Sequence, residues 1–141
     1  MPVLDRPFRV TTDASGYAIG AILSQICPET GKEYVVCYAT RLLKETERFY
    51  SVSEREALAI IWALTMWREY LCRKFEVVTD AKAITFLLTN KSPNMRLCRW
   101  FITLQAFDFD IKYRKGTDNK CADLLSRPIR KSLKSRTNLH N

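Results

Sequence analysis

The hydrophobic pattern changes its period near residue 50, and this change limits the folds that the chain can adopt. Before it lie three segments rich in β-branched and aromatic residues: residues 8–12 (FRVTT), 17–25 (YAIGAILSQ) and 34–40 (YVVCYAT). Turn-forming residues at 13–16 (DASG) and 28–32 (PETGK) separate them. Three strands joined by short turns predict an antiparallel meander.

A helix is predicted after the meander. Apolar residues recur at intervals of three and four positions over residues 53–70, and Ser53 with Glu56 matches an S-x-x-E capping box. The later segments predict a strand over 75–79, helices over 81–88 and 95–106, a strand over 109–113 and a short helix ending near residue 125. The order β-β-β-α-β-α-α-β-α predicts an α/β fold with a five-stranded mixed sheet, in which the meander is joined by parallel strands and helices flank the sheet.

Length and charge predict one domain and a tail. The 141 residues suit a single core, which we expect over residues 1–128. Of the net charge of +8, five positive charges lie in residues 127–141, which contain no acidic residue, so the rest of the chain carries +3. Residues 129–141 are predicted to form a basic, disordered tail. A basic excess suits a polyanionic partner, but solvated surface charge explains it as well.

Cysteine usage and hydropathy exclude two classes of protein. The five cysteines include no C-x-x-C pair, and the single histidine is His140, so a zinc site is not predicted. Reduced and mostly buried thiols are expected. No apolar run approaches the roughly 20 residues of a membrane span, and the N-terminus does not resemble a signal peptide. These features predict an intracellular location and no membrane partner.

Four acidic residues occupy places from which a metal site can form. Asp13 follows the first predicted strand and Asp80 follows the fourth, so both carboxylates reach the same edge if these strands are parallel neighbours. Glu56, in the first turn of the long helix, and Asp123, in the last helix, can converge there. Clustered carboxylates repel unless cations bind, and Mg²⁺ prefers oxygen ligands. Two such ions about 4 Å apart can activate water and stabilise the leaving oxygen of a phosphodiester.

Each acid also has a purely structural interpretation. Asp13 can form a turn, Glu56 can complete a capping box, Asp80 can cap a helix, and Asp123 can be a surface acid. The residue pattern alone leaves both interpretations open, because it does not show that the four side chains meet.

A series of motifs runs along the chain in a recognisable order. The motifs are residues 12–15 (TDAS), 20–25 (GAILSQ), Tyr50 with 54–59 (EREALA), 67–71 (WREYL), 75–80 (FEVVTD), 99–100 (RW) and 116–127 (GTDNKCADLLSR). With these motifs, residues 3–128 resemble the ribonuclease H domain of gypsy-type LTR retrotransposon reverse transcriptases. The first and last motifs together, at this separation, are highly specific.

The resemblance implies a fold, a reaction and partners. Such domains cut the RNA strand of RNA/DNA hybrids with two Mg²⁺ or Mn²⁺ ions. The family's catalytic and metal-binding acids fall on Asp13, Glu56, Asp80 and Asp123. Glu56 is preferred over Glu54 because Ala59 supplies the small residue expected three positions later. The implied partners are the hybrid and the polymerase domain of a parent polyprotein, the implied location is a cytoplasmic particle or the nucleus, and the isolated domain is expected to be monomeric.

Nucleic-acid contacts are predicted near the acids and on basic segments. The candidates are Ser15, Gly16, Tyr17, Arg96, Arg99, Arg114 and Lys115. Many ribonucleases H carry a histidine before the last helix, but residues 113–116 (YRKG) contain none, as is common in the gypsy-type domains. A separate basic handle helix is also missing, so Arg96 and Arg99 are expected to replace its phosphate contacts.

Other residues of the motifs and of the strands receive structural roles. A core position is predicted for Trp100 and a structural role for Gln25. Asp108 and Asp110 flank Phe109 on a strand and are expected on its exposed face.

An alternative interpretation keeps the fold and removes the catalysis. A host gene derived from such an element can retain a domesticated, catalytically weak domain that binds nucleic acid or a protein. The four intact acids favour the active nuclease.

Overall fold

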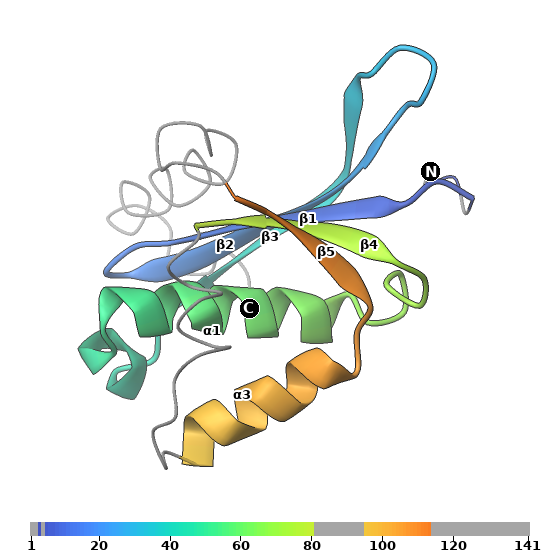
Figure 1. Cartoon of the computed structure of the whole chain (residues 1–141). Helices are drawn as coiled ribbons and strands as arrows, with labels where there is room; N and C mark the ends of the chain where they lie inside the picture. The colour runs from blue at the N-terminus through green and yellow to red at the C-terminus, as the bar shows by residue number, and fades with distance from the viewer. Residues whose placement is uncertain (1–2, 4, 81–94, 114–141) are drawn as a thin grey trace.

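The five predicted strands form one mixed sheet, in the order β3-β2-β1-β4-β5. The computed structural model describes residues 3, 5–80 and 95–113. Its elements are β1 (Phe8–Ala14), β2 (Ala18–Ile26), β3 (Glu33–Leu42), a 3₁₀ helix η1 (Thr46–Phe49), α1 (Val52–Met66), β4 (Phe75–Thr79), α3 (Met95–Gln105) and β5 (Phe109–Tyr113). Strands β1, β2 and β3 pair antiparallel, whereas β1 with β4 and β4 with β5 pair parallel. The predicted α/β fold is confirmed (Figure 1).

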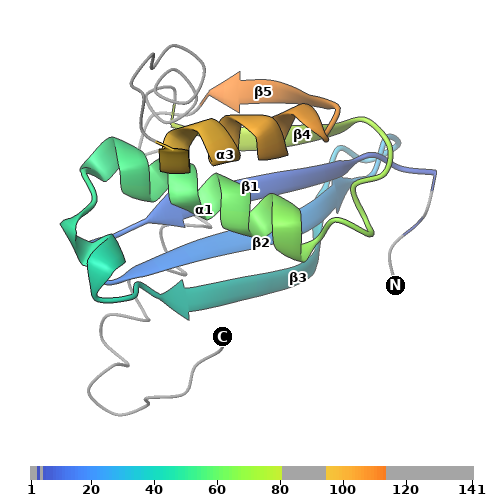
Figure 2. The same cartoon turned by 90° about the horizontal axis from the view of Figure 1, so that it is seen from below.

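Helices α1 and α3 lie on the same face of the sheet (Figures 1 and 2). The alternation along β1 and β4 turns Val10 and Val77 into the core on this face, where they join Ile60 and Leu64 of α1. All four side chains are fully buried. Three alanines of α1 are also fully buried, and their small size lets the helix backbone approach the sheet closely.

Several element boundaries differ from those predicted. Helix α1 ends at Met66 instead of residue 70, because Trp67 leaves the helical conformation (φ −103°, ψ 24°) and packs into the core. Strand β3 extends to Glu33 and Leu42, since its pairing with β2 continues to both ends. The predicted helices over 81–88 and near residue 125, and the tail 129–141, lie outside the described residues.

Gln25 anchors the segment that precedes β1. Its buried amide accepts a hydrogen bond from the backbone N–H of Val3 (2.9 Å) and donates to the carbonyl oxygens of Val3 (2.6 Å) and Arg6 (2.9 Å). A buried amide with three such bonds restrains the backbone that it contacts. The predicted structural role of Gln25 is confirmed.

A buried arginine crosses the sheet face opposite α1. Arg9 of β1 pairs with Glu33 of β3 (3.1 Å) and Glu76 of β4 (2.6 Å), and the Ser24 hydroxyl donates to Glu33 (2.6 Å). Burial of an unpaired charge is costly, so the two flanking carboxylates are what allow an arginine here. Sequence analysis missed this network because its members are far apart in the chain.

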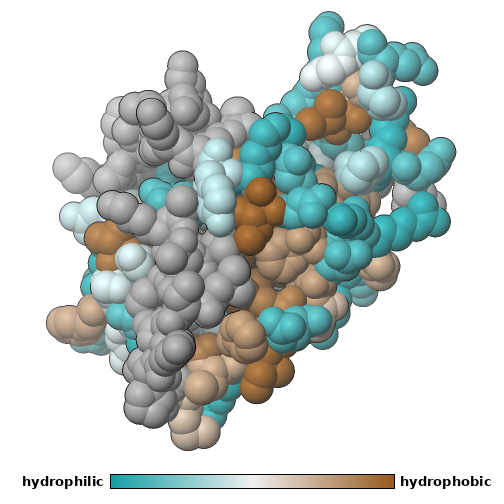
Figure 3. Space-filling model, viewed as in Figure 1, coloured by the Kyte–Doolittle hydropathy of each residue, from teal (hydrophilic) through white to brown (hydrophobic). Residues whose placement is uncertain are grey.

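The surface departs from one expectation. Cys72 and Cys98 are exposed, although mostly buried thiols were predicted; Cys27 is buried, Cys37 is partly buried and none of these four forms a disulfide. Cys72 lies in the loop before β4 and Cys98 on the outer side of α3, and neither position faces the core. Hydrophobic surface gathers low in Figure 3, around α3, where Met95 and Ile102 are exposed, whereas the β2–β3 hairpin is mostly hydrophilic. In the described ranges, no helix has the length and apolar character that a membrane span requires.

Candidate active site

The central strands β1 and β4 bring two of the predicted acids to one edge of the sheet. They are parallel neighbours, with Val10 opposite Val77, so their carboxyl ends meet. Asp80 directly follows β4, as predicted. Asp13 lies within β1 and not just beyond it, because the antiparallel pairing of β1 with β2 continues through Asp13 and Ala14. The juxtaposition expected for Asp13 and Asp80 is therefore present in the fold.

The third acid lies on α1 and is free of the capping role. The helix N-cap is Ser51, whose side chain accepts from the backbone N–H of Glu54, while the Glu54 carboxylate accepts from the Ser51 N–H. The predicted capping box of Ser53 and Glu56 is wrong by two residues, since the helix begins one residue before Ser53. Glu56 then lies two residues beyond the capping box, and its carboxylate is available to the sheet edge.

The electrostatic environment of Glu56 shows that three carboxylates converge. Burial, and after it the negative charges of Asp13 and Asp80, raise the pKa of Glu56 to about 8. Arg55 and a hydrogen bond with the Ala14 backbone oppose the rise. A carboxyl group responds to like charges in this way when they lie close to it. The edge of the sheet is thus a site of concentrated negative potential.

The chemistry of these oxygen donors fits a hard divalent cation. Carboxylates from Asp13, Glu56 and Asp80 are the ligand type that Mg²⁺ and Mn²⁺ prefer. Within residues 3, 5–80 and 95–113, no group of three or more His, Cys, Asp or Glu side chains is arranged so that it could hold a metal ion. Charge repulsion acts over a longer range than metal coordination. Asp13 and Asp80 can therefore raise the pKa of Glu56 although the described side chains do not form a closed metal site. The fourth predicted acid, Asp123, lies outside the described residues.

The turn after Asp13 carries three predicted nucleic-acid contacts. The Ser15 hydroxyl accepts hydrogen bonds from the backbone N–H groups of Tyr17 (3.2 Å) and Ala18 (3.1 Å), so Ser15 shapes the β1–β2 turn. Gly16 and Tyr17 are exposed at its tip, with Tyr17 retaining 52% of its accessible surface. These two residues can therefore reach a ligand bound beside Asp13, and their contact with nucleic acid stays a prediction.

The two predicted arginines of α3 have different surroundings. The Arg96 guanidinium pairs with Glu54 and lies over the Tyr50 ring, 4.1 Å from its centroid, so it ties α3 to the start of α1. Arg99 is exposed. Trp100 is buried and packs edge-on against Tyr50, which confirms its core position. The remaining predicted contacts, Arg114 and Lys115, lie outside the described residues.

Two further residues have the surface positions predicted for them. Asp108 and Asp110 are exposed, and Asp110 pairs loosely with Lys74 at 3.4 Å. Both lie at the end of the sheet where β5 begins, away from Asp13 and Asp80. This placement agrees with their structural interpretation.

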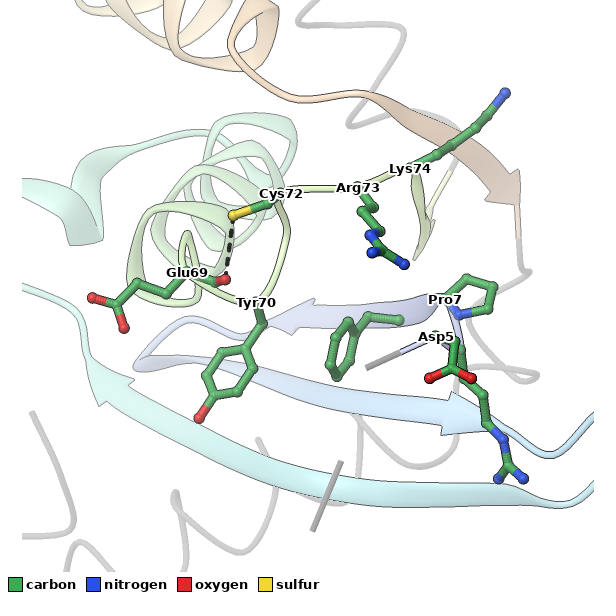
Figure 4. Close-up of a pocket in the computed structure, with 9 residues that line it drawn as sticks. Asp5, Pro7, Glu69, Tyr70, Cys72, Arg73 and Lys74 are labelled. Carbon is green, nitrogen blue, oxygen red and sulfur yellow. Dashed lines mark hydrogen bonds between the residues drawn. The ribbon is translucent and has the colours of Figure 1, made fainter. Parts of the chain in front are cut away.

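A pocket of about 360 Å³ opens at the end of the sheet opposite the acids. It is lined by residues that precede β1 and by the segment between α1 and β4, including Arg6, Tyr70, Arg73 and Lys74 (Figure 4). Because β1 and β4 are parallel, their amino ends lie at this pocket and their carboxyl ends lie at Asp13 and Asp80. The pocket is separate from the acid cluster.

Comparison with known sequences identifies the proteins that this chain resembles. Residues 3–107 match the RNase H-like domain found in reverse transcriptase. The chain is 41% identical over 128 residues to a retrovirus-related Pol polyprotein from transposon opus of Drosophila melanogaster, covering 89% of this chain and 13% of that protein. It is 44% identical over 123 residues to the transposon Tf2-3 polyprotein of Schizosaccharomyces pombe, covering 84% and 9%. The chain thus spans only a small part of these polyproteins.

Solved structures share the fold. A foamy viral protease–reverse transcriptase in complex with dsDNA superposes with a TM-score of 0.68 at 18% identity, over 82% of this chain and 25% of that one. RNase H1 from the archaeon Halobacterium salinarum gives a TM-score of 0.65 at 17% identity, over 89% of this chain and 98% of that one. The family match over most of the chain, supported by this common fold and by relatives that are retrotransposon Pol polyproteins, shows that the chain belongs to the RNase H-like domains of reverse transcriptases.

Proposed function

We propose that this domain hydrolyses the RNA strand of RNA/DNA hybrids with two bound Mg²⁺ or Mn²⁺ ions, as the nuclease part of a gypsy-type retrotransposon reverse transcriptase. The observation that carries the proposal is the convergence of Asp13, Glu56 and Asp80, expressed in the raised pKa of Glu56. Such a concentration of partly buried carboxyl groups is unfavourable for folding and is typical of functional sites.

The proposed ligands of the ions are the carboxylates of Asp13, Glu56 and Asp80, with Asp123 as the fourth. When bound, the ions supply an activated water and stabilise the leaving oxygen of the phosphodiester. Without ions, Glu56 holds a proton on its carboxyl group at neutral pH, because its pKa is about 8. Glu56 must release this proton to become a ligand, so ion binding and deprotonation are coupled.

Relatives of known structure support the choice of substrate. The foamy viral protease–reverse transcriptase and LC11-RNase H1, both of the same fold, have been solved in complex with RNA/DNA hybrids. The exposed Gly16, Tyr17 and Arg99 of this chain provide candidate contacts to the hybrid backbone. In the polyprotein relatives, the polymerase domain is the proposed partner that helps to hold the hybrid, and tethering of this kind raises apparent affinity.

The direct test is cleavage of a hybrid whose RNA strand is labelled, with Mg²⁺ or Mn²⁺ and with EDTA as a metal-free control. Asp80→Asn should lower the rate by about 100-fold or more, since loss of a metal ligand removes several kcal/mol of transition-state stabilisation. Asp108→Asn is the matched control, because Asp108 is an exposed aspartate remote from the acid cluster. Hybrid binding by the wild type without cleavage under either metal would reject the nuclease.

The same experiment separates the alternative of a domesticated binding module. Hybrid binding that survives Asp13→Ala, in a protein whose wild type never cuts, favours that alternative. A wild type that cuts the hybrid, together with an Asp13→Ala variant that still binds the hybrid but no longer cuts it, supports the nuclease.

A further inference from the structure

The last residue of β4, Thr79, carries a buried hydroxyl that has no hydrogen-bond partner among the described residues. Thr79 has no accessible surface, and its Oγ1 makes no hydrogen bond within the described part of the chain. Most buried polar side-chain atoms are hydrogen-bonded, so a native exception calls for an explanation. Thr79 directly precedes Asp80, which connects this exception with the acid cluster.

The alternation of β4 places Thr79 on the face of the sheet that carries α1. Phe75 and Val77 belong to the core on this face, and Thr79 is the next residue with the same orientation. The register of Val10 with Val77 continues to bring Thr12 beside Thr79. Thr12 and Thr79 therefore form a polar strip at the end of the apolar core. This strip lies at the edge where the charges of Asp13 and Asp80 raise the pKa of Glu56.

Core packing alone would favour valine at this position. Threonine and valine have nearly the same shape, and the buried neighbours Val77 and Val78 are valines. A buried hydroxyl without a partner costs about 1–3 kcal/mol. Thr79 is thus a net destabilising choice in the metal-free fold, and an interaction outside that fold is needed to offset its cost.

We propose that Thr79 is a positioning residue for the metal-binding carboxylates, an inference that rests on the proposed function. With ions bound, the carboxylates of Asp80 and Glu56 would be held in fixed orientations, and the Thr79 Oγ1–H would donate to one of their oxygens or to a water beside them. Hydrogen bonds to ligating carboxylates orient them, and their loss lowers metal affinity. The Thr79 hydroxyl therefore contributes to ion affinity at the expense of stability.

The test compares Mn²⁺ affinity with stability in the 141-residue protein. Mn²⁺ binding is measured by calorimetric titration, and the free energy of unfolding is measured in EDTA. Thr79→Val should unfold at the same or a higher denaturant concentration than the wild type, while its Mn²⁺ affinity falls about 10-fold. Thr40→Val is the control and should leave Mn²⁺ affinity unchanged, because this buried threonine lies on edge strand β3, separated from Asp13 by strand β2.

A second pair of variants isolates the hydroxyl if Thr79→Val folds poorly. Thr79→Ser keeps the hydroxyl without the methyl group and should bind Mn²⁺ like the wild type, whereas Thr79→Ala should bind about 10-fold more weakly. Equal Mn²⁺ affinities of wild type and Thr79→Val, or of the serine and alanine variants, overturn the inference and leave the nuclease proposal intact. A wild type that binds no Mn²⁺ overturns both proposals.

Discussion

The raised pKa of Glu56 predicts a stability that depends on pH in a specific direction. The pKa rises from 4.5 to about 8 in the folded protein, so the folded state holds this proton more tightly than the unfolded state does. The stabilisation by the proton is fully present below pH 4.5, is lost as the pH rises toward 8, and does not change further above it. Glu56→Gln is neutral at every pH and escapes this loss.

The size of the effect follows from the same two pKa values. The difference between them corresponds to about 5 kcal/mol when the pH exceeds both. Glu56 retains partial access to water, which screens part of this cost, so about 2–3 kcal/mol is expected. In EDTA, the free energy of unfolding of Glu56→Gln should exceed that of the wild type by this amount at pH 8.5. At pH 5 the difference should be less than about 1 kcal/mol.

Chemical denaturation at the two pH values measures the difference, with Glu45→Gln as an exposed glutamate control that should match the wild type at both. Excess Mg²⁺ at pH 8.5 should stabilise the wild type, because ions bind the deprotonated carboxylates. The difference in the free energy of unfolding between Glu56→Gln and the wild type should therefore become smaller. A difference between Glu56→Gln and wild type that is equal at pH 5 and pH 8.5 would refute the reasoning, as would a less stable variant at pH 8.5.

Two further predictions concern the helix that presents Glu56. Ser51→Ala should lower the free energy of unfolding by about 1 kcal/mol through loss of the N-cap, whereas Ser53→Ala should change it by less than about 0.5 kcal/mol. Urea denaturation of both variants measures these changes. A larger loss for Ser53→Ala than for Ser51→Ala would indicate that Ser53 is the N-cap. Ile60→Ala should cost about 2–5 kcal/mol because the side chain is fully buried between α1 and the sheet. Its denaturation midpoint, compared with that of the exposed-site variant Thr65→Ala, measures the loss, and a cost below about 1 kcal/mol would contradict this packing.

Local sequence signals were sufficient for the five strands and for helices α1 and α3, but not for the ends of these elements or for η1. The β-branched and aromatic content of residues 8–12 predicted the strand, because such side chains suit a pleated surface. The spacing of Leu58, Ile61, Trp62 and Met66 predicted the helix, because burial of one helix face imposes this period. The capping box was ambiguous, since residues 51–54 (SVSE) and 53–56 (SERE) both fit S-x-x-E. Only the packing of α1 on the sheet selects the first of these.

The candidate site shows the same division. The residue types and motifs of the sequence singled out Asp13, Glu56 and Asp80 as candidates. The fold adds that β1 and β4 pair in parallel and that the charges of both aspartates raise the pKa of Glu56. Neither the burial of Arg9 between two glutamates nor the unpaired hydroxyl of Thr79 leaves a signal in the sequence pattern.

The physical reason is the range of the interactions. Period, turn and cap preferences arise among residues a few positions apart, so the sequence by itself determined the kinds of elements, their order and the acids that they carry. Charge repulsion, burial and hydrogen-bond satisfaction depend on groups such as Arg9 and Glu76, which are 67 positions apart and meet only in the sheet. The tertiary structure alone therefore decided the register of the strands, the raised pKa of Glu56 and, among the described residues, the lack of a hydrogen-bond partner for the Thr79 hydroxyl.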